Sequence, residues 1–219
     1  MKTENKFKAI IFDLDGTLLD SLEDLADGAN VALKKLGFEA HPKEAYKTFV
    51  GDGVVNLLKR ACPEGASDEI IQKAVKLKKE YYQDNWANKS CLYEGVSELL
   101  TSLKEKGIVL TVLSNKPDHF TQEIMKHFFS NWSFDLIYGA REGVTIKPNP
   151  QGVFDIIAEL KLKREECLYV GDTNTDMQTA KNAELYALGV TWGFREEQEL
   201  LENGASRIAH HPKEILELF

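Results

Sequence analysis

The chain has 219 residues, of which 43% are hydrophobic and 28% are charged, a composition typical of globular proteins in water. Its formal net charge of −8 argues against nucleic-acid binding, which depends on basic surfaces that neutralise phosphates. No apolar run approaches the ~18 residues of a membrane span, and residues 1–6 lead into a strand, not into a signal sequence. We therefore expect a cytoplasmic protein that binds neither nucleic acid nor a membrane.

Three cysteines, Cys62, Cys91 and Cys167, are widely spaced along the chain. Their odd number and the lack of a C-x-x-C pair indicate neither a disulfide framework nor a zinc site. We expect them to be small, buried hydrophobic residues in a reducing compartment.

The first predicted strand, residues 7–12, is followed by helical patterns up to about residue 87. Ser21 is the expected N-cap of a helix that ends at Gly37. Pro42 is expected to open a second helix, and Ser67 to cap the last and longest helix of this stretch. The block has the content of a small helical bundle.

After residue 95 the pattern changes to alternating helices and strands, which predicts βαβ units and a mostly parallel sheet. The fold class that follows is α/β, a doubly wound core of residues 1–19 and 92–219 with a helical cap, residues 20–91, inserted after the first strand. The expected strands are 108–113, 134–138, 167–170 and 185–190, and the expected helices are 97–106, 120–128, 151–160 and 175–182.

Two carboxylates, Asp13 and Asp15, follow the first strand directly in the sequence Asp-Leu-Asp-Gly-Thr of residues 13–17. In open α/β sheets ligands bind beyond the carboxyl ends of the strands. Two residues apart on an extended backbone, these side chains are expected to point to the same side. The alternative is a plain turn, because Asp and Gly are common turn residues.

Three further polar clusters occur at or near the predicted strand ends: Ser114-Asn115-Lys116, Lys147-Pro148 and Gly171-Asp172-Thr173 with Asp176. Singly, each has a structural explanation: a polar turn, a surface lysine or a helix N-cap. Together they are predicted to converge on one site at the edge of one sheet. Oxygen ligands suit Mg²⁺, and hydroxyls with a lysine suit a phosphoryl group.

The four motifs, in this order, resemble those of the haloacid dehalogenase superfamily of phosphohydrolases. The position of the inserted block resembles the subgroup with a helical cap. The resemblance implies that Asp13 attacks phosphorus and that Asp15 protonates the leaving group and then activates water. Because dehalogenases lack an acid at the second position, Asp15 favours phosphoryl chemistry.

The resemblance also implies the ligands of the phosphate and the metal. Thr17, Ser114 and Asn115 would hold the phosphoryl oxygens, and Lys147 would offset negative charge. Mg²⁺ would be bound by the residues Asp13, Asp15 (through its main-chain carbonyl) and Asp172. Asp176 would be either a water-mediated ligand or an orienter of the lysine.

Substrate choice is expected to come from the cap, where Gly51 and Arg60 are candidate binding residues. The motifs resemble the phosphoglycolate phosphatase group, and phosphoglycolate is the leading substrate among small phosphorylated metabolites. A sugar-phosphate phosphatase or phosphomutase stays open, although Val54 stands where such mutases usually carry arginine. The non-enzyme alternative is a phospho-accepting, receiver-like signalling module. The oligomeric state, monomer or homodimer, stays open.

Overall fold

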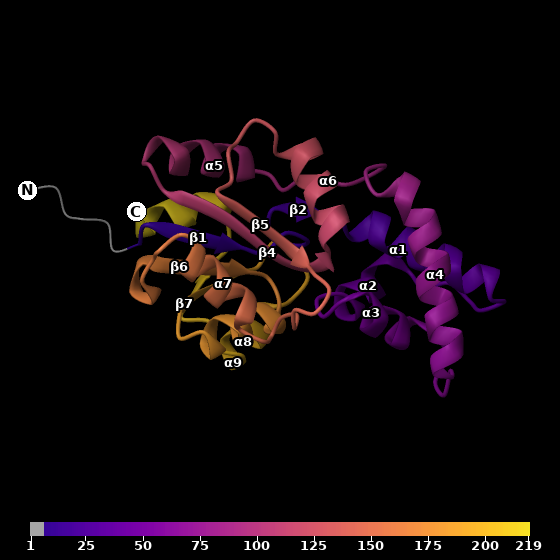
Figure 1. Cartoon of the computed structure of the whole chain (residues 1–219). Helices are drawn as coiled ribbons and strands as arrows, with labels where there is room; N and C mark the ends of the chain where they lie inside the picture. Colours follow the sequence, from indigo (N-terminus) through magenta and orange to yellow (C-terminus); the bar gives the residue numbers. More distant parts are fainter. Residues whose placement is uncertain (1–6) are drawn as a thin grey trace, which may run out of the picture. The chain divides into compact units, whose positions relative to one another are not determined.

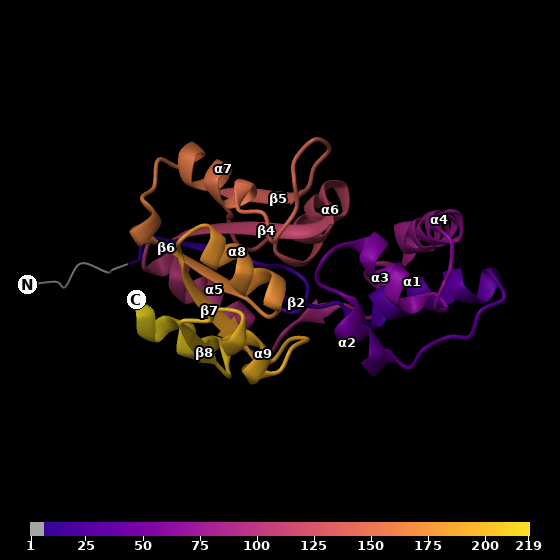
Figure 2. The same ribbon diagram turned by 90° about the horizontal axis from the view of Figure 1, so that it is seen from below.

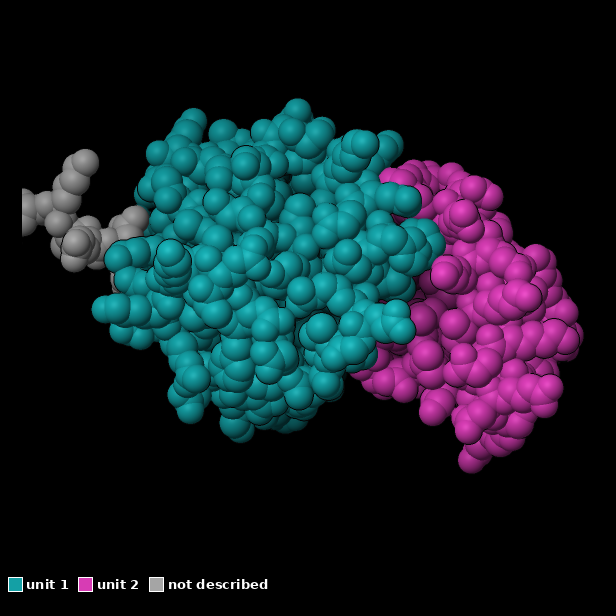
Figure 3. All heavy atoms as spheres, viewed as in Figure 1, with its two compact units in different colours: residues 1–19, 92–219 teal, residues 20–91 magenta. Residues whose placement is uncertain are grey.

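The structure is a computed structural model that describes residues 7–219. Residues 1–6, for which the sequence predicts no signal sequence, lie outside the described part. The chain forms two compact units: unit 1 is residues 1–19 and 92–219, and unit 2 is residues 20–91 (Figure 3). Among the described residues, no helix has both the length and the apolar character needed to cross a membrane.

Unit 1 is built on a six-stranded sheet in which all neighbouring strands are parallel (Figure 1). The chain winds from the central strand first to one side of the sheet and then to the other, so the predicted doubly wound α/β class is confirmed. In spatial order the strands are β5 (Leu136–Ala140), β4 (Val109–Pro117), β1 (Ala9–Phe12), β6 (Cys167–Gly171), β7 (Tyr186–Val190) and β8 (Arg207–Ala209).

The sheet is covered on both faces, with α5 and α6 on one side and α7 and α8 on the other (Figure 1, Figure 2). This coverage explains why the strands read as continuous apolar runs without alternation. On the second face, side chains of β1 and β6 pack with α7 and α8 in one buried cluster. The helical elements of unit 1 are α5 (Val96–Glu105), α6 (Asp118–Phe128), α7 (Gln151–Glu159), η2 (Arg164–Glu166), α8 (Asn174–Asn182), α9 (Glu197–Glu202) and η3 (Pro212–Leu218).

The register of the central strands brings the polar clusters to one level. Phe12, the last residue of β1, pairs with Val112 of β4 and with Val170 of β6. Asp13 therefore lies beside the end of β6 and beside the start of the polar part of β4, and its N–H donates to the Val170 carbonyl at 2.9 Å. This edge is the switch point of the topology, where open α/β sheets bind their ligands.

Strand β4 runs further than the sequence predicts, from Val109 to Pro117 instead of ending at Leu113. The polar residues 114–116 therefore belong to the strand and do not form a turn after it. The pairing with β5 becomes irregular between Leu113 and Pro117, which is a local departure that side-chain polarity alone does not reveal.

Unit 2 consists mainly of helices. Ser67 caps α4, because its Oγ accepts a hydrogen bond from the Ile70 N–H at 3.3 Å. Ser21 occupies the N-cap position of α1, as predicted, although its side chain makes no capping hydrogen bond. Its helical elements are α1 (Leu22–Lys35), η1 (Lys43–Ala45), α2 (Tyr46–Phe49), α3 (Val54–Ala61) and α4 (Asp68–Asn85).

A buried aspartate of α1, Asp24, binds the C-terminal residues of unit 2, Lys89 and Ser90. Asp24 Oδ2 accepts hydrogen bonds from the N–H groups of Lys89 and Ser90, at 3.0 and 2.8 Å, and from the Ser90 hydroxyl at 2.7 Å. The chain passes from unit 1 into unit 2 along β2 (Leu19–Asp20) and returns to unit 1 along β3 (Cys91–Leu92). These two short strands pair with one another. Cys62 and Cys167 are buried as predicted, but Cys91 is exposed because β3 belongs only to this two-stranded sheet.

Candidate active site

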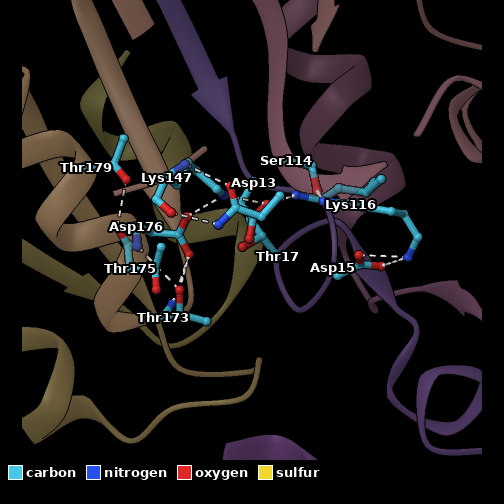
Figure 4. Close-up of polar contacts among 12 residues, drawn as sticks. Asp13, Asp15, Thr17, Ser114, Lys116, Lys147, Thr173, Thr175, Asp176 and Thr179 are labelled. Carbon is cyan, nitrogen blue, oxygen red and sulfur yellow. Dashed lines mark hydrogen bonds and ion pairs between the residues drawn. The ribbon is translucent and has the colours of Figure 1, made fainter. Parts of the chain in front are cut away.

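The two carboxylates that follow β1 point to different partners, contrary to the sequence expectation. The strand ends at Phe12 and the chain bends at Leu14, so the two-residue alternation of an extended backbone no longer holds. Asp13 turns toward Lys147 and Asp15 toward Lys116 (Figure 4). The two aspartates of the motif thus pair with two different lysines.

Asp13 belongs to a buried chain of charges. Its Oδ1 lies 2.8 Å from Lys147 Nζ and accepts a hydrogen bond from the Leu14 N–H at 2.7 Å. The same ammonium lies 2.7 Å from Asp176 Oδ1. Lys147 therefore bridges two carboxylates that come from β1 and from the start of α8.

Asp176 is fully buried and held by more than the lysine. With Thr173 it forms a capping box at the N-terminus of α8: Thr173 donates to Asp176 Oδ2 through its N–H and its hydroxyl, at 3.1 and 2.6 Å. The Tyr169 hydroxyl donates to Asp176 Oδ1 at 3.2 Å. The N-cap that the sequence offered as an alternative thus exists, and it exists within the charged cluster.

Asp172, at the end of β6, is also fully buried. The hydroxyl of Thr17 donates to its Oδ1 at 3.0 Å. Thr17 therefore connects the loop after β1 to the loop after β6. Its expected contact with a phosphoryl oxygen stays a prediction.

Burial and mutual repulsion dominate the electrostatics of the cluster. Burial, and then the negative charge of Asp176, raise the pKa of Asp13 to about 7, although Lys147 opposes the shift. Burial and the charges of Asp176 and Asp13 raise the pKa of Asp172 well above its ordinary value. Burial lowers the pKa of Lys147, but the two adjacent carboxylates outweigh it and hold the pKa well above normal.

The donor set fits a hard divalent cation. One oxygen from each of Asp13, Asp172 and Asp176 lies within 4.8 Å of the others. Three carboxylates in this space, with one bridging ammonium, leave an excess of buried negative charge that a dication would neutralise. All-oxygen ligands of this kind suit Mg²⁺. Metal binding by the Asp15 main-chain carbonyl stays a prediction.

Lys116 belongs to a predicted polar cluster but had no predicted role, and the structure shows it buried and bound to Asp15. Its Nζ lies 2.8 Å from each oxygen of that carboxylate. The available signal was its position directly after Ser114 and Asn115. A lysine in a polar cluster at the end of a strand places its positive charge at the sheet edge where Asp15 lies.

Asn115 supports Lys147, a role that the sequence did not predict. Its amide nitrogen donates to the Lys147 carbonyl at 3.0 Å, and its Oδ1 accepts from the Lys147 N–H at 2.8 Å. The hydroxyl of Ser114 accepts from the Lys116 N–H at 3.2 Å. Phosphate contacts of Ser114 and Asn115 stay predictions.

The two candidate residues of unit 2 are placed as follows. Gly51 lies between α2 and α3 with a φ of 124°. Arg60 of α3 donates to the Phe49 carbonyl at 2.9 Å and to Asp52 Oδ1 at 2.6 Å, and pairs with Asp52 through its second nitrogen. Within unit 2 this guanidinium is thus oriented by neighbours of its own unit, and substrate contact by either residue stays a prediction.

Comparison with known proteins gives consistent matches over nearly the whole chain. The family model described as haloacid dehalogenase-like hydrolase matches residues 10–190. The chain is 33% identical to the phosphoglycolate phosphatase of Mannheimia succiniciproducens, covering 98% of this chain and 96% of that protein. It is 35% identical to the phosphoglycolate phosphatase of Haemophilus influenzae, covering 86% and 88%. A crystal structure named as a predicted phosphoglycolate phosphatase from Haemophilus somnus superposes with a TM-score of 0.90 at 30% identity, covering 99% of each chain.

Proposed function

We propose that this chain, which belongs to the haloacid dehalogenase-like hydrolase family and is a phosphatase, hydrolyses a small phosphate monoester with the help of Mg²⁺. The observation that carries the proposal is the Asp13–Lys147 contact beside a buried carboxylate cluster. A nucleophile, a cation and a set of metal ligands are thereby available at one point. The family match sets aside the receiver-like signalling module.

The metal ligands in this proposal are Asp13, the main-chain carbonyl of Asp15, and Asp172. When bound, the cation neutralises the phosphoryl group and the nucleophile that approaches it. Asp176 is assigned to orienting Lys147, because its Oδ1 accepts a hydrogen bond from the lysine ammonium while Tyr169 and Thr173 hold the carboxylate.

In the first half-reaction, a carboxylate oxygen of Asp13 attacks phosphorus in line with the ester oxygen. The P–O bond to the substrate breaks, and Asp15 gives its proton to the departing alkoxide. The products are an alcohol and an aspartyl phosphate on Asp13. Lys147 stabilises the negative charge of the phosphoryl oxygens.

In the second half-reaction, Asp15 removes a proton from water, which attacks phosphorus. The bond between phosphorus and Asp13 breaks, and inorganic phosphate leaves. Asp15 ends the cycle protonated, as it began it, so the protons balance. The Lys116 ammonium group, which binds Asp15, keeps this carboxyl group oriented for both proton transfers.

Phosphoglycolate is the proposed substrate, supported by the named activity of relatives that span nearly the same length as this chain. A sugar-phosphate substrate is the runner-up. The cytoplasmic location expected from the sequence stays a prediction.

The test is phosphate release from a panel of small phosphate esters, with Mg²⁺ and with EDTA. We expect release to require Mg²⁺ and to be fastest with phosphoglycolate. Asp13→Asn is expected to abolish it, whereas Asp84→Asn, which changes an exposed aspartate of α4, serves as the matched control. Turnover by Asp13→Asn would exclude the proposed nucleophile, and faster turnover of sugar phosphates would change only the substrate.

A further inference from the structure

The loop that follows β7, here called the 192–194 loop, consists of Trp192, Gly193 and Phe194. Strand β7 lies beside β6 in the sheet and runs parallel to it. The loop therefore emerges at the same carboxyl edge as Asp172 and the loop after β1. No motif in the sequence pointed to it.

The first contact of the loop is with a carboxylate of the proposed metal site. The N–H of Phe194 donates to Asp172 Oδ2 at 2.8 Å. The other oxygen of Asp172 accepts from the Thr17 hydroxyl. Both oxygens are thus held by neutral donors, which fix the rotation of the carboxylate.

The second contact ties the loop to the segment that carries the proposed nucleophile. The indole N–H of Trp192 donates to the main-chain carbonyl of Thr17 at 2.9 Å. Since the Thr17 hydroxyl binds Asp172, one residue of the catalytic loop is held on its main chain by Trp192 and on its side chain by Asp172. The three segments form one hydrogen-bonded unit.

The third feature is the absence of a side chain at Gly193. A Cβ there would lie 2.3 Å from the Gly16 carbonyl oxygen and 2.4 Å from Asp172 Oδ2. The first of these atoms belongs to the backbone and cannot move aside as a side chain would. Gly193 does not have a positive φ, so the position requires space rather than a special conformation. Gly16 lies equally close to this carboxylate, since a Cβ there would lie 2.2 Å from the same oxygen.

We propose that the 192–194 loop positions Asp172 for divalent-cation binding, so that Trp192 and Gly193 set the affinity of the metal site without binding the metal themselves. The inference rests on the proposed function in one respect, that Asp172 is a metal ligand. Partners that orient metal ligands typically contribute about 10- to 100-fold in metal affinity.

The experiment measures Mn²⁺ binding to the full chain from the electron paramagnetic resonance signal of free Mn²⁺. Trp192→Phe keeps an aromatic side chain, although a smaller one, and removes the indole N–H that donates to Thr17, and we expect its dissociation constant for Mn²⁺ to rise about 10-fold. Gly193→Ala is expected to raise it further. The matched controls are Trp132→Phe, which loses a similar indole bond to Thr101, and Gly189→Ala, whose Cβ would meet side chains of Leu200 and Ile208.

Both controls are expected to bind Mn²⁺ as the wild type does, even where they unfold at a lower urea concentration. Wild-type affinity in Trp192→Phe, or an equal loss in Trp132→Phe, would overturn the proposal. If Gly193→Ala does not fold, Trp192→Phe decides alone. Asp172→Asn tests the metal assignment of the proposed function separately from the role of the 192–194 loop. This variant must lose Mn²⁺ binding. Unchanged affinity would show that Asp172 is not a metal ligand.

Discussion

The ammonium group of Lys116 lies 2.8 Å from both carboxylate oxygens of Asp15, and the lysine side chain is only 4% exposed. A proton donor must be held within hydrogen-bonding reach of the group that it protonates, and such catalysis contributes about 10²- to 10⁴-fold. We predict that Lys116→Met lowers kcat by about 10- to 100-fold, since Asp15 remains but loses its fixed orientation.

Steady-state kinetics on the best phosphate ester checks this prediction. Lys126→Met, which changes an exposed lysine of α6, is the control and should leave kcat unchanged. The readout that separates orientation from folding is the leaving group. Esters with acidic alcohols need less proton donation, so their turnover should fall less in Lys116→Met. An equal loss for all esters would contradict the assigned role.

The raised pKa of Asp13 predicts that the metal-free protein loses stability as the pH rises. This carboxyl has a reference pKa of 3.8 and a pKa of about 7 in the folded state. Between these values the folded state binds more protons than the unfolded state, so the free energy of unfolding falls with increasing pH. Mg²⁺ binds the ionised form, and its stabilising effect should therefore grow through pH 7.

Thermal unfolding across this pH range, in EDTA and in excess Mg²⁺, provides the measurement. Asp13→Asn removes the titrating group and should be more stable than the wild type in EDTA at pH 8. The difference should shrink toward pH 5. A variant that is less stable than the wild type at pH 8 would show that the charge is already compensated without metal.

Removing Asp176 should destabilise the fold strongly. Asp176→Ala leaves the Lys147 ammonium short of one carboxylate and deprives Thr173 and Tyr169 of their acceptor in a fully buried place. Breaking a buried pair of this kind costs about 3–5 kcal/mol of unfolding free energy. Urea denaturation measures it, with Asp155→Ala as control. Asp155 pairs with Arg141 at a partly exposed position, where the expected cost is at most about 1 kcal/mol.

Asp24 is expected to be a main determinant of stability in unit 2. Asp24→Ala removes the acceptor of three hydrogen bonds from Lys89 and Ser90. The buried Ser90 N–H then loses its partner, whereas the Ser90 hydroxyl keeps its bond to the Trp86 carbonyl, so the expected cost is about 2 kcal/mol of unfolding free energy. Amide hydrogen exchange at Ser90 should become faster than in Asp27→Ala, which loses only a partly exposed contact with Lys89. Equal exchange in the two variants would refute the assignment.

Much of the fold was accessible from the sequence because the strands of a parallel sheet are buried on both faces. Runs such as the one before Asp13 are apolar throughout, and helices separate them at regular intervals. The C-terminal strand β8 was missed, since its three residues, 207–209, are too few for a pattern to show. The end of β4 was misjudged because polarity at 114–116 resembles a turn.

The polar edge of the sheet was predictable from the residues. The pairing of Lys147 with Asp13 and Asp176 was implied only by the family resemblance, and the pairing of Lys116 with Asp15 was not predicted. Which lysine meets which aspartate depends on the bend at Leu14, and tertiary geometry of that kind has no periodic signature. The contact of Asn115 with the backbone of Lys147 was not predictable, because an amide suits a peptide group as well as a phosphoryl oxygen. Trp192 donates to a main-chain carbonyl, and Gly193 leaves room for Asp172 and the Gly16 carbonyl. Neither contact has a signature in the sequence.

The central position of β1 in the sheet determines when this strand can pair during translation. This strand pairs with β4 on one side and β6 on the other, so the residue proposed to attack phosphorus leaves the ribosome long before its neighbours exist. The helical unit 2 is contiguous in sequence and can fold meanwhile, whereas β1 must wait as an apolar segment without strands to pair with. Chaperone contact during synthesis should therefore concentrate on the first strand until β6 has emerged.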